Sequence, residues 1–96
     1  MLDAQGRITI KKELLSKNDF IKANGVVKLF YNPIIKCLLI KSECFEGDDN
    51  LYYISTHKLD TKCRMFMPIS IQKAFPGATY LVSEKDGNIY IHIIEH

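Results

Sequence analysis

The feature that most constrains this chain is an internal repeat with an offset of 57 residues. "LDAQGRITIKKEL" begins at Leu2, and "LDTKCRMFMPISI" begins at Leu59. The offset aligns identical residues, and apolar residues at the same spacing: Leu2 with Leu59, Asp3 with Asp60, Arg7 with Arg64, Ile8 and Ile10 with Met65 and Met67, and Leu14 with Ile71. The sequence therefore predicts one structural unit that is used twice.

Each repeat begins with a turn that leads into a strand. Asp3 to Gly6 fits a β-turn, because Asp at the first position accepts backbone N–H bonds and Gly suits the fourth. "RITI" then alternates as a strand does, with Ile8 and Ile10 on one face. The other face carries Arg7, Thr9 and Lys11. The apolar positions are predicted to form the core: Ile8, Ile10, Leu14, Met65, Met67 and Ile71.

A short helix and a hairpin are expected to follow in each repeat. The first helix is predicted over residues 11–17. In the second repeat Pro68 suits the first helical position, and Pro76 followed by Gly77 ends the helix. Asp86-Gly87 is a favoured pair for a tight hairpin turn, whereas the first hairpin turns around Asn32-Pro33.

The chain divides into a first repeat, residues 1–42, an acidic connector, residues 43–50, and a second repeat, residues 51–96. "NLYYISTHK" predicts a further strand before Leu59, where the first repeat has only Met1. A unit of this kind covers neither its own strand edges nor its apolar face. The expected fold is therefore mostly β with short helices, in which two strand–turn–strand–helix–hairpin repeats interleave into one closed or nearly closed barrel.

Charge is distributed unevenly, although the net charge is only +2. Residues 1–41 carry a net +5, residues 42–57 carry −4 and residues 58–96 carry +1. A basic face that gathers a polyanion is one interpretation, with the acidic connector kept away from it. Scattered, solvated charge is the other interpretation, and composition alone favours it.

The string Leu-Asp-x-x-Gly-Arg-Ile-x-Ile, followed by a short helix and a hairpin, resembles the SpoVT–AbrB family of DNA-binding proteins with a swapped-hairpin barrel. The family strand usually continues into Ile-Pro, which the second repeat keeps as Met67-Pro68 and the first replaces with Ile10-Lys11. The second repeat also has Cys63 where glycine is expected. Two units in one chain resemble the arrangement of the MraZ group, in a shorter form. The resemblance implies transcriptional regulation, or the antitoxin half of a toxin–antitoxin pair.

The resemblance places the DNA contacts around the arginine after each turn, which makes Arg7 and Arg64 paired anchors. An arginine fork holds a phosphate or reads guanine, and exposed N–H groups at a helix start favour phosphate. Four lysines are weaker candidates for phosphate contacts: Lys11, Lys12, Lys62 and Lys73. Alternatively, each arginine pairs with the aspartate of its own turn and braces it, and the two roles are compatible.

Phe66 takes the place of Thr9 on the arginine side of its strand. Three interpretations are open: Phe66 stacks on a ligand, packs under the hairpin, or marks a copy that has lost DNA contact. Packing is the preferred interpretation.

No metal, cofactor or catalytic site is predicted. Cys37 lies in an apolar run and is expected to be a buried thiol, and the spacing of Cys44, His57 and Cys63 matches no tight zinc site. The histidines have no partner motif for acid–base work, no nucleophile motif or Gly-rich phosphate loop occurs, and an enzyme is not expected.

No apolar run approaches the ~20 residues of a membrane span, and no signal peptide is recognisable. The expected location is the cytoplasm.

Two functions from different classes follow. The first is a regulator that binds double-stranded DNA. The second is a protein-interaction module or antitoxin that assembles or grips a protein partner such as a toxin, and that binds DNA little. A homodimer or larger homo-oligomer is expected in either case, because the absence of a strand before Leu2 leaves a sheet edge open to another chain.

Overall fold

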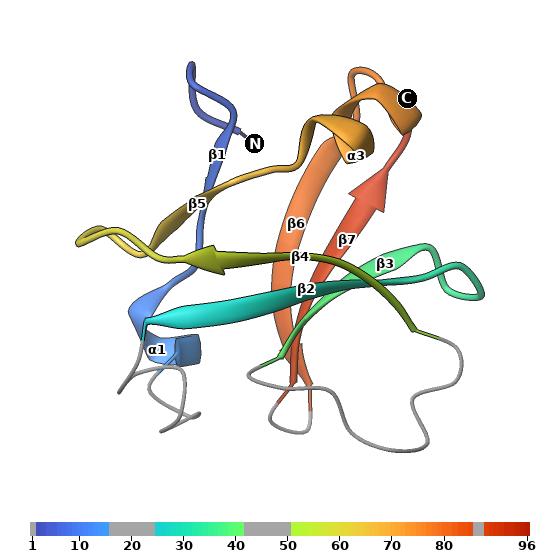
Figure 1. The fold of residues 1–96 in the computed structure, drawn as a ribbon. Helices are drawn as coiled ribbons and strands as arrows, with labels where there is room; N and C mark the ends of the chain where they lie inside the picture. Colours follow the sequence, from blue (N-terminus) through green and yellow to red (C-terminus); the bar gives the residue numbers. More distant parts are fainter. Residues whose placement is uncertain (1, 16–24, 42–50, 86–87) are drawn as a thin grey trace.

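A computed structural model describes residues 2–15, 25–41, 51–85 and 88–96 (Figure 1). The described part is mostly β with two short helices, as predicted. In chain order the elements are β1 (Arg7–Thr9), α1 (Lys12–Leu15), β2 (Val26–Asn32), β3 (Cys37–Lys41), β4 (Tyr52–Lys58), β5 (Arg64–Phe66), α3 (Ile69–Ala74), β6 (Thr79–Lys85) and β7 (Asn88–Ile94). No helix among these residues is long and apolar enough to cross a membrane.

The strands form two sheets, and neither sheet closes on itself. β1 and β5 form an antiparallel pair, and the other strands form a five-stranded sheet in the order β4-β2-β3-β7-β6. The hairpins β2–β3 and β6–β7 therefore meet in the middle of the larger sheet, where β3 pairs with β7. Because two open sheets are seen, the closed barrel stays a prediction.

An approximate twofold rotation relates the two repeats within the β1–β5 pair. Ile8 lies opposite Met65, its own equivalent at the offset of 57. The backbone N–H of Ile10 donates to the carbonyl of Cys63 at 2.8 Å, and that of Met67 donates to the carbonyl of Gly6 at 2.9 Å. These two bonds are equivalent under the same offset. Each repeat thus completes the backbone hydrogen bonding of the other.

One hydrophobic core takes side chains from both repeats. Its buried members are Ile8, Ile10, Val27, Leu29, Leu38, Ile40, Met65, Met67, Ile71, Tyr80, Ile89 and Ile91. The predicted core residues are all among them, except Leu14, which is partly buried against the cluster. A three-residue strand such as β1 has too little surface to be stable alone, so packing on this shared core holds it in place.

The local predictions differ from the structure in detail. The strand predicted before Leu59 is confirmed as β4, and α3 ends before Pro76 and Gly77 as predicted. Pro68 is the N-cap of α3 rather than its first helical residue, because its ψ of 138° is not helical. Of the first helix, predicted over residues 11–17, the structure describes α1, Lys12–Leu15. The acidic connector and the Asp86-Gly87 turn lie outside the described residues.

Candidate functional site

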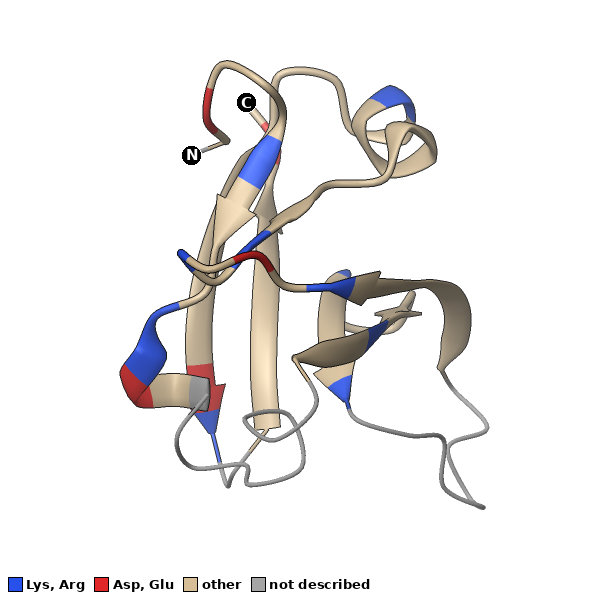
Figure 2. Ribbon diagram, turned by 60° about the vertical axis from the view of Figure 1, so that its left-hand side comes forward, with Lys and Arg blue, Asp and Glu red and all other residues tan. Residues whose placement is uncertain are grey.

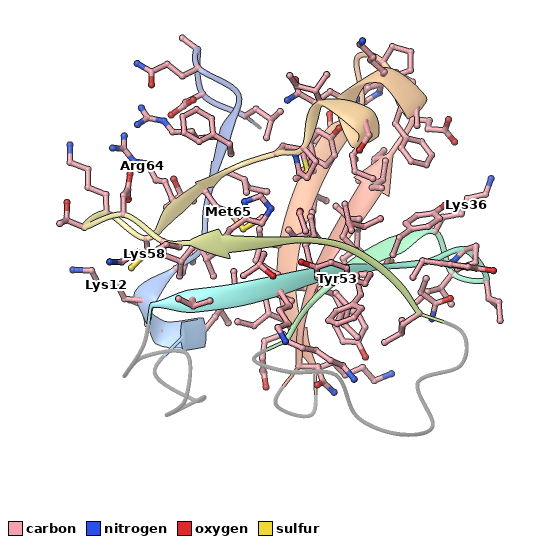
Figure 3. All side chains as sticks on the ribbon, in the orientation of Figure 1. Lys12, Lys36, Tyr53, Lys58, Arg64 and Met65 are labelled. Atoms are coloured by element: carbon pink, nitrogen blue, oxygen red, sulfur yellow. The ribbon has the colours of Figure 1, made fainter. Side chains whose placement is uncertain are left out.

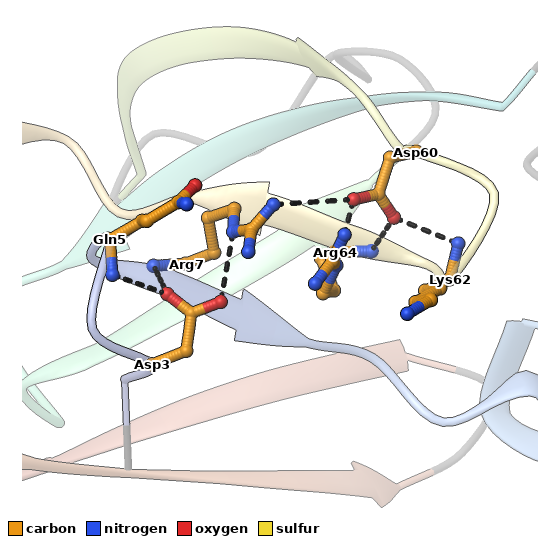
Figure 4. A network of polar contacts seen from close by, with 6 residues as sticks. All are labelled: Asp3, Gln5, Arg7, Asp60, Lys62 and Arg64. Atoms are coloured by element: carbon orange, nitrogen blue, oxygen red, sulfur yellow. Dashed lines mark hydrogen bonds and ion pairs between the residues drawn. The ribbon is translucent and has the colours of Figure 1, made fainter.

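Two equivalent turns position the two arginines. In the first turn, Asp3 Oδ1 accepts the backbone N–H groups of the residues two and four positions on, each at 2.9 Å. In the second, Asp60 Oδ1 does the same, again at 2.9 Å (Figure 4). The residue four positions on is Arg7 in the first turn and Arg64 in the second. An aspartate that caps its own turn in this way fixes where the following strand begins.

Each arginine side chain also bonds to the aspartate of its own turn. Arg7 Nε lies 2.8 Å from Asp3 Oδ2, and Arg64 Nε lies 2.8 Å from Asp60 Oδ2. Bracing of the turns is therefore confirmed. A guanidinium has five N–H donors, and this bond uses the one on Nε. Bracing thus holds each guanidinium in place and still leaves it chemically able to donate to another anion.

The same contacts keep both aspartates ionised. The backbone N–H of Arg7 lowers the pKa of Asp3, and the Arg7 side chain adds to the effect. The backbone N–H of Arg64 lowers the pKa of Asp60 in the same way. A carboxylate that accepts several N–H bonds favours its charged form. Each turn is therefore held by a charged acceptor.

The β1–β5 pairing places both arginines on one outer face. Arg7 lies opposite Phe66, and Thr9 lies opposite Arg64. Residues directly opposite in an antiparallel pair project to the same side, so these four share a face, and the residues between them are buried in the core. Arg7 Nη1 also lies 4.0 Å from Asp60 Oδ2, which links the two turns across this face.

Basic residues gather at one end of the β1–β5 pair. Because the strands are antiparallel, the turn before β5 lies next to the start of α1, and the Ile10–Cys63 backbone bond joins them. Figure 3 shows Lys12, Lys58 and Arg64 at this end, and Figure 2 shows the basic segments of α1 and of the turn between β4 and β5 on the side facing the viewer. We call this group the basic end: Lys11, Lys12, Lys58, Lys62 and Arg64.

Lys58 belongs to this group although sequence reasoning did not select it. It is exposed and is the last residue of β4, directly before the second turn. The feature of the sequence that could have identified Lys58 is its position two residues before Asp60. The pairing of β1 with β5, which connects residues far apart in the sequence, was needed to show that the turn after Lys58 lies next to the start of α1.

The opposite end of the pair exposes two large apolar side chains beside the first turn. Pro68 and Ile69 stand where the first repeat has Lys11 and Lys12. Ile69 is 69% exposed and Phe66 is 57% exposed, so the interpretation that Phe66 packs under the hairpin is wrong. We call Phe66 and Ile69 the apolar end.

Arg7 lies beside this apolar end. The Arg7 Cζ lies 5.9 Å from the centre of the Phe66 ring, within the range of a cation–π contact. The face is therefore symmetric in its backbone and asymmetric in its chemistry.

Lys73 is the one predicted lysine that the fold does not bring to the basic end. It lies in the last turn of α3. α3 follows β5 and α1 follows β1, and the two strands run in opposite directions (Figure 1). Lys73 therefore lies at the other end of the β1–β5 pair from Lys11 and Lys12.

The described residues show no group of three His, Cys, Asp or Glu side chains that could hold a metal ion. Cys44, one member of the set considered above, lies outside the described residues.

Cys37 is buried as predicted, and burial raises the pKa of its thiol. Its Sγ lies 3.1 Å from His92 Nδ1, across the β3–β7 pair. A buried neutral thiol is a poor nucleophile, so we interpret the contact between Cys37 and His92 as structural.

No family model matches the chain, and comparison with curated proteins and with solved structures found no significant match.

Proposed function

We propose that this chain is a DNA-binding transcriptional regulator of the SpoVT–AbrB type, and that it contacts duplex DNA through the basic end. The observation that carries the proposal is the outer face of the β1–β5 pair. There, two turns with the same hydrogen bonds hold Arg7 and Arg64 on one side of the molecule. A rigidly placed guanidinium loses little conformational entropy when it binds a phosphate or a base edge.

The order of the strands supports the fold that this proposal requires. In a swapped-hairpin barrel each repeat inserts its hairpin between elements of the other. Here β3 of the first repeat pairs with β7 of the second, and β1 pairs with β5. We propose that the two sheets are the two parts of such a barrel, joined by the shared core.

The charge pattern supports a polyanion as the ligand. Phosphate contacts supply most of the affinity of a protein for DNA, and each neutralised phosphate releases counterions. The basic end offers four lysines around the braced Arg64. Arg7 is the second anchor, and it lies beside an apolar end instead of further lysines. We therefore expect the first helix and the second turn to carry most of the phosphate contacts.

Fluorescence polarisation with mixed-sequence duplex DNA tests the proposal. If the five cations of the basic end each neutralise one phosphate, log Kd should rise with log salt with a slope of about 4.5, or ~10²–10³-fold between 50 and 200 mM. The double variant of Arg7→Ala and Arg64→Ala should bind at least ~10-fold more weakly, with its circular dichroism unchanged. The absence of binding at the lowest salt concentration would remove the proposal.

The exposed apolar end favours a second candidate, a protein-interaction module or antitoxin. Exposed aromatic and aliphatic side chains next to an arginine are common at the centres of protein interfaces. Under this function Phe66→Thr, which restores the residue type of Thr9, would abolish partner capture. Under the DNA function we expect the same variant to change Kd less than about twofold, whereas Lys62→Gln weakens binding.

A further inference from the structure

The two outer edges of the five-stranded sheet are not equivalent. A shift of 52 residues superimposes the hairpins in register, since it takes the pair Lys28–Lys41 to the pair Tyr80–Ile93. Under this shift β2 is the equivalent of β6. β4 lies along the outer edge of β2, whereas no strand of the described residues lies along the outer edge of β6. Among the described residues, one strand position of the approximate symmetry is thus unfilled.

β6 has the features of an edge that pairs with another strand. It is seven residues long, and its register with β7 runs without a shift from Thr79 to Lys85. Edge strands are usually protected by short length, bulges or charges. The other edge strand, β4, has one of these protections, because its pairing with β2 shows a register shift. β6 instead exposes Leu81 near its middle, at 51%.

We propose that β6 pairs antiparallel with β6 of a second copy of this chain, with Leu81 on the twofold axis. In that register Leu81 faces its own equivalent, and Thr79 faces Ser83 of the second copy. Tyr80 faces Val82, and an aromatic residue opposite a β-branched one is a favourable cross-strand pair. The inference is independent of the proposed DNA-binding function, because β6 carries none of the residues of the basic end.

The charges of β6 fit this register. Glu84 and Lys85 lie at one end of the strand, outside the symmetric pairing of Thr79 to Ser83. No like charges therefore face each other across the axis, and such pairs would be destabilising. Pairing of β6 with β4 of another copy would repeat head to tail into a ring or an open filament, whereas the β6–β6 pair closes as a dimer. The uncharged stretch of β6 thus fits a closed β6–β6 dimer.

The oligomeric state of the whole chain tests the inference. Sedimentation should give a dimer of twice the chain mass of 11.1 kDa. Leu81→Lys places two like charges face to face on the axis and should weaken the dimer at least ~10²-fold. The matched control is Ile94→Lys, because Ile94 is an exposed apolar residue on the same face but in β7, an interior strand. This variant should remain a dimer.

A crosslink provides a second measurement that does not depend on a charge. In Leu81→Cys the two introduced thiols should form a disulfide across the axis on mild oxidation, which peptide mass spectrometry identifies. A monomer at about 100 μM, a Leu81→Lys variant that remains a folded dimer, or the absence of this disulfide in a dimeric Leu81→Cys variant would each overturn the proposal. Growth into filaments would also overturn it, in favour of head-to-tail β6–β4 pairing.

Discussion

Gly6 and Cys63 occupy the same place in the two turns, and both have a positive φ, 81° for Gly6 and 58° for Cys63. Glycine adopts this conformation readily, whereas a residue with a side chain does so at a cost. The carbonyl of each accepts a backbone hydrogen bond from the strand of the other repeat. These reciprocal bonds fix the turn geometry, and Cys63 conforms to it.

Gly6→Ala should lower the free energy of unfolding by about 1–2 kcal/mol, the cost of a side chain in the left-handed region. The added Cβ would also lie 3.3 Å from Gln72 Nε2, and moving this group aside would disturb its 2.8 Å hydrogen bond to the carbonyl of Met67. Urea unfolding measures the change. Cys63→Ala is the matched control, since this residue already has a Cβ at the same φ, and it should lose clearly less stability. Equal losses in the two variants would contradict the strain argument.

The aspartates of the turns should make stability depend on pH in the acid range. The pKa of Asp60 is lower in the folded chain than its ordinary value of about 3.9, chiefly because the Arg64 N–H favours the carboxylate. The resulting stabilisation is fully present above that ordinary value and is lost as pH falls through the lower folded-state pKa.

We expect the melting temperature of the wild type to fall more steeply below about pH 4 than that of Asp60→Asn. Glu95→Gln is the control, because it removes one carboxylate outside the turns. Parallel melting curves for the wild type and Asp60→Asn at every pH would show that Asp60 is not linked to folding.

Cys37 should react slowly with alkylating reagents. Burial raises the pKa of its thiol, so little thiolate is present at pH 8, and its side chain is covered. With iodoacetamide we expect Cys37 to react at least ~10-fold more slowly than the half-buried Cys63, as followed by peptide mass spectrometry. In concentrated urea the two rates should converge. A fast reaction at Cys37 in the folded chain would argue against its burial.

Lys58 and Lys73 should differ in their effect on DNA binding. Lys58 lies at the basic end, whereas Lys73 lies at the other end of the β1–β5 pair. If Lys58 contacts a phosphate, Lys58→Gln should reduce the slope of log Kd against log salt by about 1. Lys73→Gln removes the same charge and should leave the slope nearly unchanged. Polarisation titrations at four salt concentrations distinguish the two, and equal slopes would place the DNA elsewhere.

The local parts of this structure were predictable because their causes lie within a few residues. An aspartate that caps its own turn needs only the next four residues, and so the turns at Asp3 and Asp60 followed from their motifs. The alternation of apolar residues likewise indicated that Ile8 and Met65 are buried. β4 was recognisable from its run of strand-forming residues.

The distribution of the chemistry on the outer face was not predictable in the same way. That distribution depends on the antiparallel register of β1 and β5, which is set by packing and not by local propensity. That register puts the turn before β5 next to the start of α1, places Lys73 at the far end, and leaves Phe66 exposed rather than packed. Whether two open sheets or one closed barrel form depends on similar long-range pairings, which turn motifs do not specify.

The reciprocal pairing of the repeats has a consequence for how the chain reaches its native state. Ile8 and Met65, which are opposite each other, are separated by 57 positions, and Leu38 and Ile91 are likewise distant in sequence. Such contacts form only after long stretches of polypeptide have been brought together, and that search slows folding. We expect refolding on the millisecond-to-second timescale of non-local β proteins, with both halves acquiring structure in a single step.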